Sequence, residues 1–206
     1  MGSISRELSV LTKRKIPLAI NRLKIFWLAF GLIFVFSKIS AQSNRYATTS
    51  GQTSFHSSTP AEDINAVNNK TQVLLNATSG EIAVLMTMRD FDFPNELMEE
   101  HFNENYVESA KYPRATFQGK LDRPVDLSKN GTYELLASGT FTVHGVGQPR
   151  TLRGTLTAQD NKIRLDSKFE VALEDHKIKV PQIVFVKIAQ IIEVRAAYEL
   201  APYVRK

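Results

Sequence analysis

The sequence predicts an all-β protein, an antiparallel barrel of about eight strands with one short helix. From Tyr46 onward, apolar and polar residues alternate with a period of two in most segments, short turn signals separate these segments, and one stretch has helical spacing. Because neighbouring side chains on a strand point to opposite faces, such alternation is typical of strands with one dry and one wet face. A closed barrel or a two-sheet sandwich would satisfy this pattern, and closure removes exposed strand edges.

The predicted strands follow one another through short turns. Ser79-Gly80 reads as a tight hairpin turn, and Asn130-Gly131 and Asp160-Asn161 mark later turns. No internal repeat or low-complexity linker divides the series, so we expect a single domain. The alternating segments include residues 73–77, 82–88, 115–121, 133–143, 152–158, 163–173 and 192–200.

One segment breaks the alternation and predicts a short amphipathic helix. Pro94 suits a first helical turn, and Glu96, Glu99 and Glu100 lie where the positive end of the helix dipole favours acids. We expect this helix to act as a lid or plug on the barrel. The residues at helical spacing are Leu97, Met98, His101, Phe102 and Asn105.

The inward faces combine small residues with aromatic ones, among them Phe117, Phe141, Phe169 and Tyr198. A barrel of about eight strands either fills with side chains or keeps room for one small ligand. The small residues favour room, and a tapered, packed core remains the alternative. The small inward residues are Ala77, Ala115, Gly119, Ala137, Gly139, Gly154, Ala158 and Ala196.

Beside the helix, Phe91, Phe93, Met98 and Phe102 are candidates for the lining of a ligand entrance. Aromatic rings and a flexible thioether suit contact with an alkyl chain. Ordinary packing of the helix on the barrel explains the same residues equally well.

The N-terminal segment has the order of a secretory signal, with a basic region, an apolar run and small residues. The apolar run, residues 25–36, is shorter than the roughly 20 residues of a membrane-spanning helix. Ser40 and Ala41 suit a signal peptidase, so we expect residues 1–41 to be a cleaved signal peptide, with an uncleaved anchor as the alternative. In either case residues 42–206 are expected to form the barrel outside the cytoplasm, periplasmic or secreted.

The formal net charge of +5 originates in the predicted leader, which holds seven Lys or Arg residues against one Glu. The remainder is close to neutral, with acids and bases interspersed, and this argues against nucleic-acid binding. The chain has no cysteine. Thiol nucleophiles, thiolate metal sites and disulfides are therefore excluded.

The four histidines, His56, His101, His144 and His176, give no metal-ligand spacing, and turn or rim positions are the simpler interpretation. The sequence also lacks a Gly-x-Ser-x-Gly motif and a His-Glu-x-x-His motif. We therefore expect neither a metal site, nor a cofactor, nor catalysis.

Three stretches, residues 97–102, 108–117 and 139–146, resemble the YceI-like family in order and spacing. Lys111-Tyr112-Pro113 and His144-Gly145-Val146 are the most specific pieces. The resemblance implies an extended, lipocalin-like antiparallel barrel, exported in many bacteria, whose apolar tunnel binds isoprenoid or fatty-acyl molecules. His144 matches the family motif and is expected either to donate a hydrogen bond to a ligand headgroup or, as we favour, to brace its turn.

The sequence departs from the family pattern over residues 174–187 and in its first strands, which leaves the identity of the ligand open. The leading hypothesis is a non-catalytic, exported protein that holds a lipid-like molecule in its barrel. The alternative is a solid barrel that serves as a structural or partner-binding module. Membrane attachment is expected through an uncleaved leader alone, and pairing of two barrels as a homodimer stays open.

Overall fold

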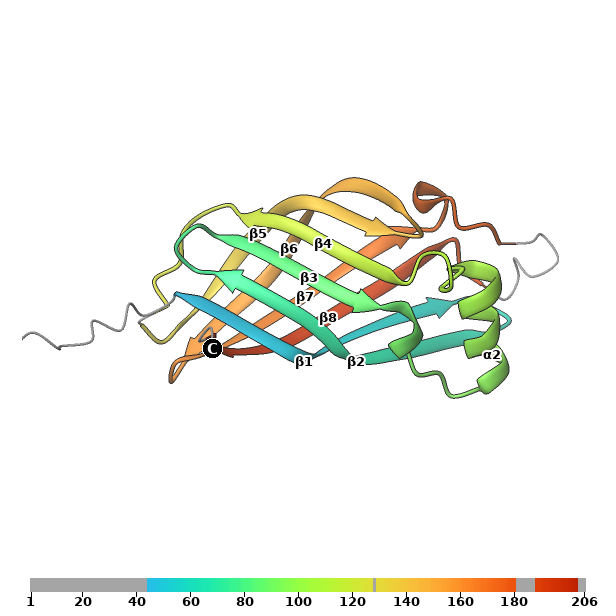
Figure 1. Cartoon of the computed structure of the whole chain (residues 1–206), viewed down its shortest axis with the longest axis horizontal. Helices are drawn as coiled ribbons and strands as arrows, with labels where there is room; N and C mark the ends of the chain where they lie inside the picture. The colour runs from blue at the N-terminus through green and yellow to red at the C-terminus, as the bar shows by residue number, and fades with distance from the viewer. Residues whose placement is uncertain (1–43, 128, 181–187, 204–206) are drawn as a thin grey trace, which may run out of the picture. The chain divides into compact units, whose positions relative to one another are not determined.

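The computed structural model describes residues 44–127, 129–180 and 188–203. In this part of the chain, eight antiparallel strands form a closed barrel, in which each strand pairs with the next and β1 pairs with β8 (Figure 1). The predicted fold class is confirmed, whereas the expected signal peptide, residues 1–41, lies outside the described residues. The strands are β1 (Arg45–Ser58), β2 (Asp63–Asn76), β3 (Glu81–Thr87), β4 (Arg114–Leu121), β5 (Gly131–Val143), β6 (Val146–Gln159), β7 (Lys162–Ala172) and β8 (Ile191–Pro202).

Burial follows the alternation that the sequence predicts. Leu75 on β2, Leu156 on β6, Ile163 on β7 and Leu200 on β8 keep 1% or less of their accessible surface. Their neighbours in sequence point outward, so one face of each strand forms the core. The hydrophobic effect therefore acts along the whole interior of the barrel.

Two hairpins close through two-residue turns in which both residues have positive φ. His144 and Gly145 join β5 to β6 with φ of 52° and 72°, and Asp160 and Asn161 join β6 to β7 with φ of 49° and 63°. This turn geometry matches the right-handed twist of the flanking strands. The turn predicted at Asp160-Asn161 is confirmed, and Asn130 supports it by accepting a hydrogen bond from the Asp160 amide.

The inward glycines do not all leave open space. A Cβ atom at Gly119 would lie 2.7 Å from the ring of Phe117, and one at Gly139 would overlap the backbone of β4. Gly119 and Gly139 face each other across the β4–β5 pair. Part of the room that small residues predict is therefore taken by a ring and by close approach of two strands.

A helical segment covers one end of the barrel and is called the lid below (Figure 1). It consists of α2 (Glu96–His101) followed by a π-helical turn, η3 (Phe102–Tyr106). Asn95 caps α2 by accepting hydrogen bonds from the amides of Leu97 and Met98, so Pro94 precedes the cap and does not occupy the first turn as expected. Among the described residues, no helix is long and apolar enough to cross a membrane.

The barrel wall is incompletely paired between β6 and β7. Their register runs from Gly154–Ser167 to Gln159–Lys162, so within the described residues the first half of β6 has no strand partner on this side. A short helical turn, η4 (Glu174–His176), covers that edge. The imidazole Nδ1 of His176 lies 3.0 Å from the carbonyl oxygen of Val146, and the amide of Gln148 donates to the carbonyl of Asp175.

Candidate ligand-binding cavity

A cavity of about 430 Å³ lies between the lid and the interior of the barrel. Strands far apart in the sequence contribute to its apolar wall, because alternate residues of each strand point inward. Segments beyond the strands, among them Leu173 and Ile178, complete it. Six of the apolar wall residues are Met86, Met88, Val143, Val171, Ile192 and Val194.

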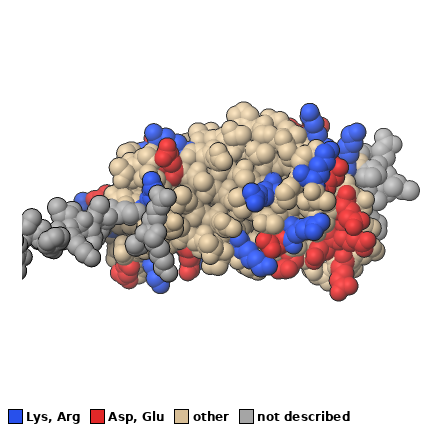
Figure 2. Space-filling view, in the orientation of Figure 1, with Lys and Arg blue, Asp and Glu red and all other residues tan. Residues whose placement is uncertain are grey.

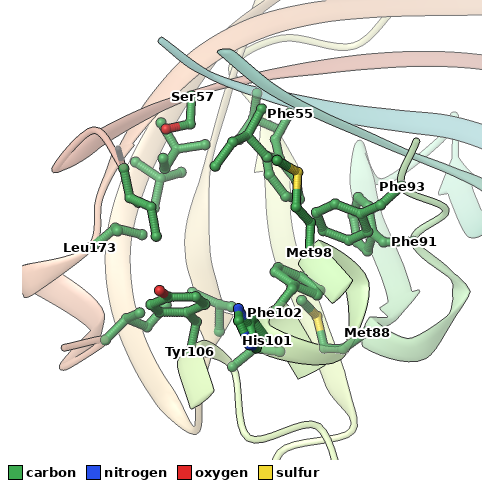
Figure 3. A pocket seen from close by; sticks show the side chains of 18 of the residues that line it. Phe55, Ser57, Met88, Phe91, Phe93, Met98, His101, Phe102, Tyr106 and Leu173 are labelled. Atoms are coloured by element: carbon green, nitrogen blue, oxygen red, sulfur yellow. The ribbon is translucent and has the colours of Figure 1, made fainter. Parts of the chain in front are cut away.

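Four aromatic rings join the lid to the barrel at one side of this cavity (Figure 3). Phe102 lies 5.5 Å from Phe55, 5.9 Å from Phe91 and 5.0 Å from Phe93, measured between ring centroids. Such tilted and offset arrangements are favourable for aromatic pairs. Phe91, Phe93, Met98 and Phe102, the four residues expected at an entrance, all line the cavity.

Phe55 is a cavity residue that the sequence reasoning missed. It lies on β1 and packs against Phe91 with ring centroids 5.5 Å apart. Its inward neighbours on the strand are Thr53 and Ser57, both polar and both buried. Because this part of β1 has polar residues on its inward face as well as on its outward face, it lacks the usual alternation. Phe55, the aromatic residue between Thr53 and Ser57, was the signal in the sequence that could have indicated an inward face.

A second, smaller cavity of about 80 Å³ lies deeper in the barrel. Phe117, Phe169 and Tyr198, which the sequence places on inward faces, line it. Phe141 lines both cavities, together with Thr53 and Met86. These three residues form the junction between the main cavity and the inner cavity.

His144 lies in neither cavity. Its Nε2 is 2.6 Å from a carboxylate oxygen of Glu108, and its Nδ1 is 3.1 Å from the carbonyl oxygen of His176. Each ring nitrogen of His144 therefore faces an acceptor oxygen of the protein. The hydrogen bond to His144 holds the pKa of Glu108 below its ordinary value. This geometry is that of a brace for the turn, and a contact of His144 with a ligand headgroup stays a prediction.

Three hydroxyl groups form a buried polar cluster in the barrel wall. Thr53 Oγ1 lies 2.9 Å from Thr71 Oγ1 and 2.9 Å from the Tyr198 hydroxyl. Burial raises the pKa of Tyr198 to about 12, so its phenol stays neutral. The cluster places polar atoms at the junction of the two cavities, whose mostly apolar walls also include Glu62, Asn95 and His101 in the main cavity and Arg153, Asp166 and Ser167 in the inner one.

The surface around the lid is acidic. Figure 2 shows Asp and Glu side chains gathered over the end of the barrel that carries the lid, where Glu96, Glu99, Glu100 and Glu104 follow one another. In the described part of the chain, no group of three or more His, Asp or Glu side chains is placed to hold a metal ion. The acids contribute negative potential near the cavity.

An eight-stranded antiparallel barrel with an apolar cavity under a helical lid defines the class of barrel proteins that enclose one small molecule. The chain matches the YceI-like domain over residues 34–200, and it belongs to this family. A comparison with curated proteins found no match.

Solved structures share the fold at low sequence identity. A polyisoprenoid binding domain from Saccharophagus degradans, implicated in plant cell wall breakdown, has a TM-score of 0.66 at 14% identity over 78% of this chain and 99% of that one. BcnA of Burkholderia cenocepacia has a TM-score of 0.61 at 14% identity over 73% and 96%. The YCEI protein of Campylobacter jejuni has a TM-score of 0.52 at 17% identity over 66% and 81%. These likenesses support the fold.

Proposed function

We propose that this protein binds a long apolar molecule, of isoprenoid or fatty-acyl type, inside its barrel. The observation that carries the proposal is the main cavity of about 430 Å³, with its wall of aromatic, methionine and branched aliphatic residues. A pocket of this size and composition is typical of small-molecule sites. The family and the structural likeness to a polyisoprenoid binding domain agree with it.

The driving force is removal of the ligand from water. Each buried methylene contributes about 0.8 kcal/mol, so affinity increases with chain length until the available space is filled. Phe141 lies at the junction, where a ligand chain that fills the main cavity would enter the inner cavity. We therefore expect Phe141 to limit the length of chain that the barrel can bind.

We propose further that the bound molecule is released unchanged. The described barrel contains two acid–histidine pairs, Glu108–His144 and His56–Asp63. Both pairs lie outside the two cavities. A general acid or base has to reach its substrate within hydrogen-bonding distance, so neither pair acts on a molecule in the barrel.

The proposal places this binding protein outside the cytoplasm. Its support is the order of basic region, apolar run and small residues at the N-terminus. An exported carrier of this kind would shield its apolar ligand from the water outside the cytoplasm. Cleavage after Ala41 leaves a free barrel, whereas an uncleaved leader keeps it at the membrane.

Native mass spectrometry of the full chain, expressed with a C-terminal tag in an exporting bacterial host, tests the proposal. The expected spectrum contains a species heavier by one lipid, which organic solvent removes and identifies. The protein mass also reports whether residues 1–41 are lost. A bare protein that takes up neither prenyl nor acyl chains would overturn the binding function and favour the solid, partner-binding barrel.

A further inference from the structure

The hydroxyl groups of Thr53, Thr71 and Tyr198 are here called the hydroxyl cluster. Thr53 and Thr71 keep 2% and 0% of their accessible surface, and Tyr198 keeps 7%. Thr53 lines both cavities, and Tyr198 lines the inner one. The cluster therefore borders the space in which the proposed ligand lies.

An irregularity in β1 builds this cluster. The pairing of β1 with β2 shifts register on either side of Gly51, two residues before Thr53. A Cβ atom at Gly51 would lie 2.7 Å from the ring of Tyr198 and 3.1 Å from the carbonyl oxygen of Thr71. The Tyr198 ring therefore occupies the space that a side chain at position 51 would need. Irregularities of this kind in a strand change the direction in which neighbouring side chains point. The local backbone is arranged around the hydroxyls.

Counting protons shows that the hydroxyl cluster has one donor to spare. Three hydroxyl groups carry three protons, and the two contacts of 2.9 Å use two of them. No other hydrogen bond is formed by these three side chains within the described residues. The unused proton lies on Thr53, Tyr198 or Thr71, and the first two of these residues line the cavities, where a ligand can supply an acceptor. A buried donor without an acceptor is unfavourable, so the arrangements at the wall gain most from a ligand.

We propose that the hydroxyl cluster anchors a neutral acceptor oxygen of the ligand, such as a ketone, ester or ether oxygen, at the junction of the two cavities. The inference rests on the proposed binding function and deepens it, because it names the chemical class of the ligand and the depth of its polar group. The junction residues are Thr53, Met86 and Phe141, none of them cationic. Arg153 lines the inner cavity, but it is an exposed residue and not part of the junction. Burial of a carboxylate against them would leave its charge unpaired, which is costly.

A set of straight-chain ketones of equal length tests the inference. Heptadecanones carry the carbonyl near the end, a third of the way along or at the centre of the chain, and heptadecane is the matched hydrocarbon. Because apolar area is nearly constant in the set, affinity differences report where the carbonyl lies. For the delipidated protein we expect one isomer to bind about threefold to tenfold more tightly than heptadecane and than the other isomers.

Two variants assign that preference to the cluster. Tyr198→Phe and Thr53→Val remove one hydroxyl each and keep most of the side-chain volume, and each is expected to abolish the preference, so that the formerly preferred ketone binds no more tightly than heptadecane when both are measured on the same variant. Tyr46→Phe is the matched control, because the Tyr46 hydroxyl faces Asn161 and lies in neither cavity. A preference that persists in both variants would overturn the inference.

A second measurement needs no variant. The stretching band of an isotope-labelled carbonyl in the bound ketone is expected at lower wavenumber than in hexane, as hydrogen bonding requires. A band at the hexane position, or equal affinity of all ketones and heptadecane, would overturn the anchor and leave the binding function standing. Failure of every compound, heptadecane included, to bind would overturn both.

Discussion

The ring of Tyr112 lies against the imidazole of His144, with ring centroids 4.5 Å apart and an angle of 66° between the planes. Tyr112 follows the lid in the chain, and His144 belongs to the β5–β6 turn. The two motifs that carry the resemblance to the YceI-like family, Lys111-Tyr112-Pro113 and His144-Gly145-Val146, therefore meet in one contact. Lys111 adds to it, with its ammonium 4.8 Å from the centre of the Tyr112 ring. This contact fixes the exit of the lid on the rim of the barrel.

Gly145→Ala is expected to destabilise the protein. Gly145 has φ of 72°, and a Cβ atom there would lie 2.6 Å from the Tyr112 ring. The left-handed conformation alone costs about 1–2 kcal/mol for a residue with a side chain. Urea unfolding should show this loss in the free energy of unfolding. Gly147→Ala is the control, because its Cβ would meet two side-chain atoms of β5 and its φ is not positive; an equal loss in both variants would contradict the explanation.

The Glu108–His144 hydrogen bond predicts a pH dependence on the acid side. Because the pKa of Glu108 is lowered in the folded state, its contribution to stability is present above the ordinary carboxyl value of 4.5 and is lost as the pH falls below it. Glu108→Gln removes the titrating group. Stability measured by urea unfolding at decreasing pH should therefore decline less steeply below 4.5 in Glu108→Gln than in the unchanged protein, and parallel curves would contradict this.

The sequence predicts the barrel from the end of β2 to β8 because period-two alternation is a local property of each strand. On β1 the same reasoning fails at Gly51, where the register with β2 shifts and the inward positions carry Thr53 and Ser57. Tertiary packing against Tyr198, which is far away in the sequence, determines that irregularity. Phe55 was missed for the same reason.

The candidate site shows a similar division. Phe91, Phe93, Met98 and Phe102 lie near one another in the sequence, and their apolar character beside a helix indicated the cavity wall. Outside the cavities, the buried His176 gave no such signal, because its burial depends on the unpaired edge of β6. Strand pairing that stops halfway is a long-range property, and a single sequence does not display it.

Burial of His176 predicts a second pH effect, at higher pH than that of Glu108. Burial lowers the pKa of His176 below its ordinary value of 6.5, so the unfolded chain binds the proton more readily than the folded one. Stability is therefore expected to decline as the pH falls from about 6.5 toward the lowered pKa. His176→Phe removes the titration but also the hydrogen bond to Val146, so this variant should be less stable near neutral pH and flatter across this range. An unchanged slope in His176→Phe would assign the effect to another group.

Replacement of Phe141 is expected to change the selectivity for chain length. In the unchanged protein, affinity for a series of unbranched alcohols should rise by about 0.8 kcal/mol per methylene and level off where the chain reaches the junction. Phe141→Leu removes ring atoms that separate the main and inner cavities, so the rise should continue to longer chains.

Phe93→Leu is the matched control at the lid, where Phe93 lines the main cavity alone. It should weaken all chains that fill the main cavity to a similar extent and leave the levelling point in place. Displacement of a fluorescent acyl probe measures both series, and a levelling point that Phe141→Leu does not move would show that chains stop short of the junction.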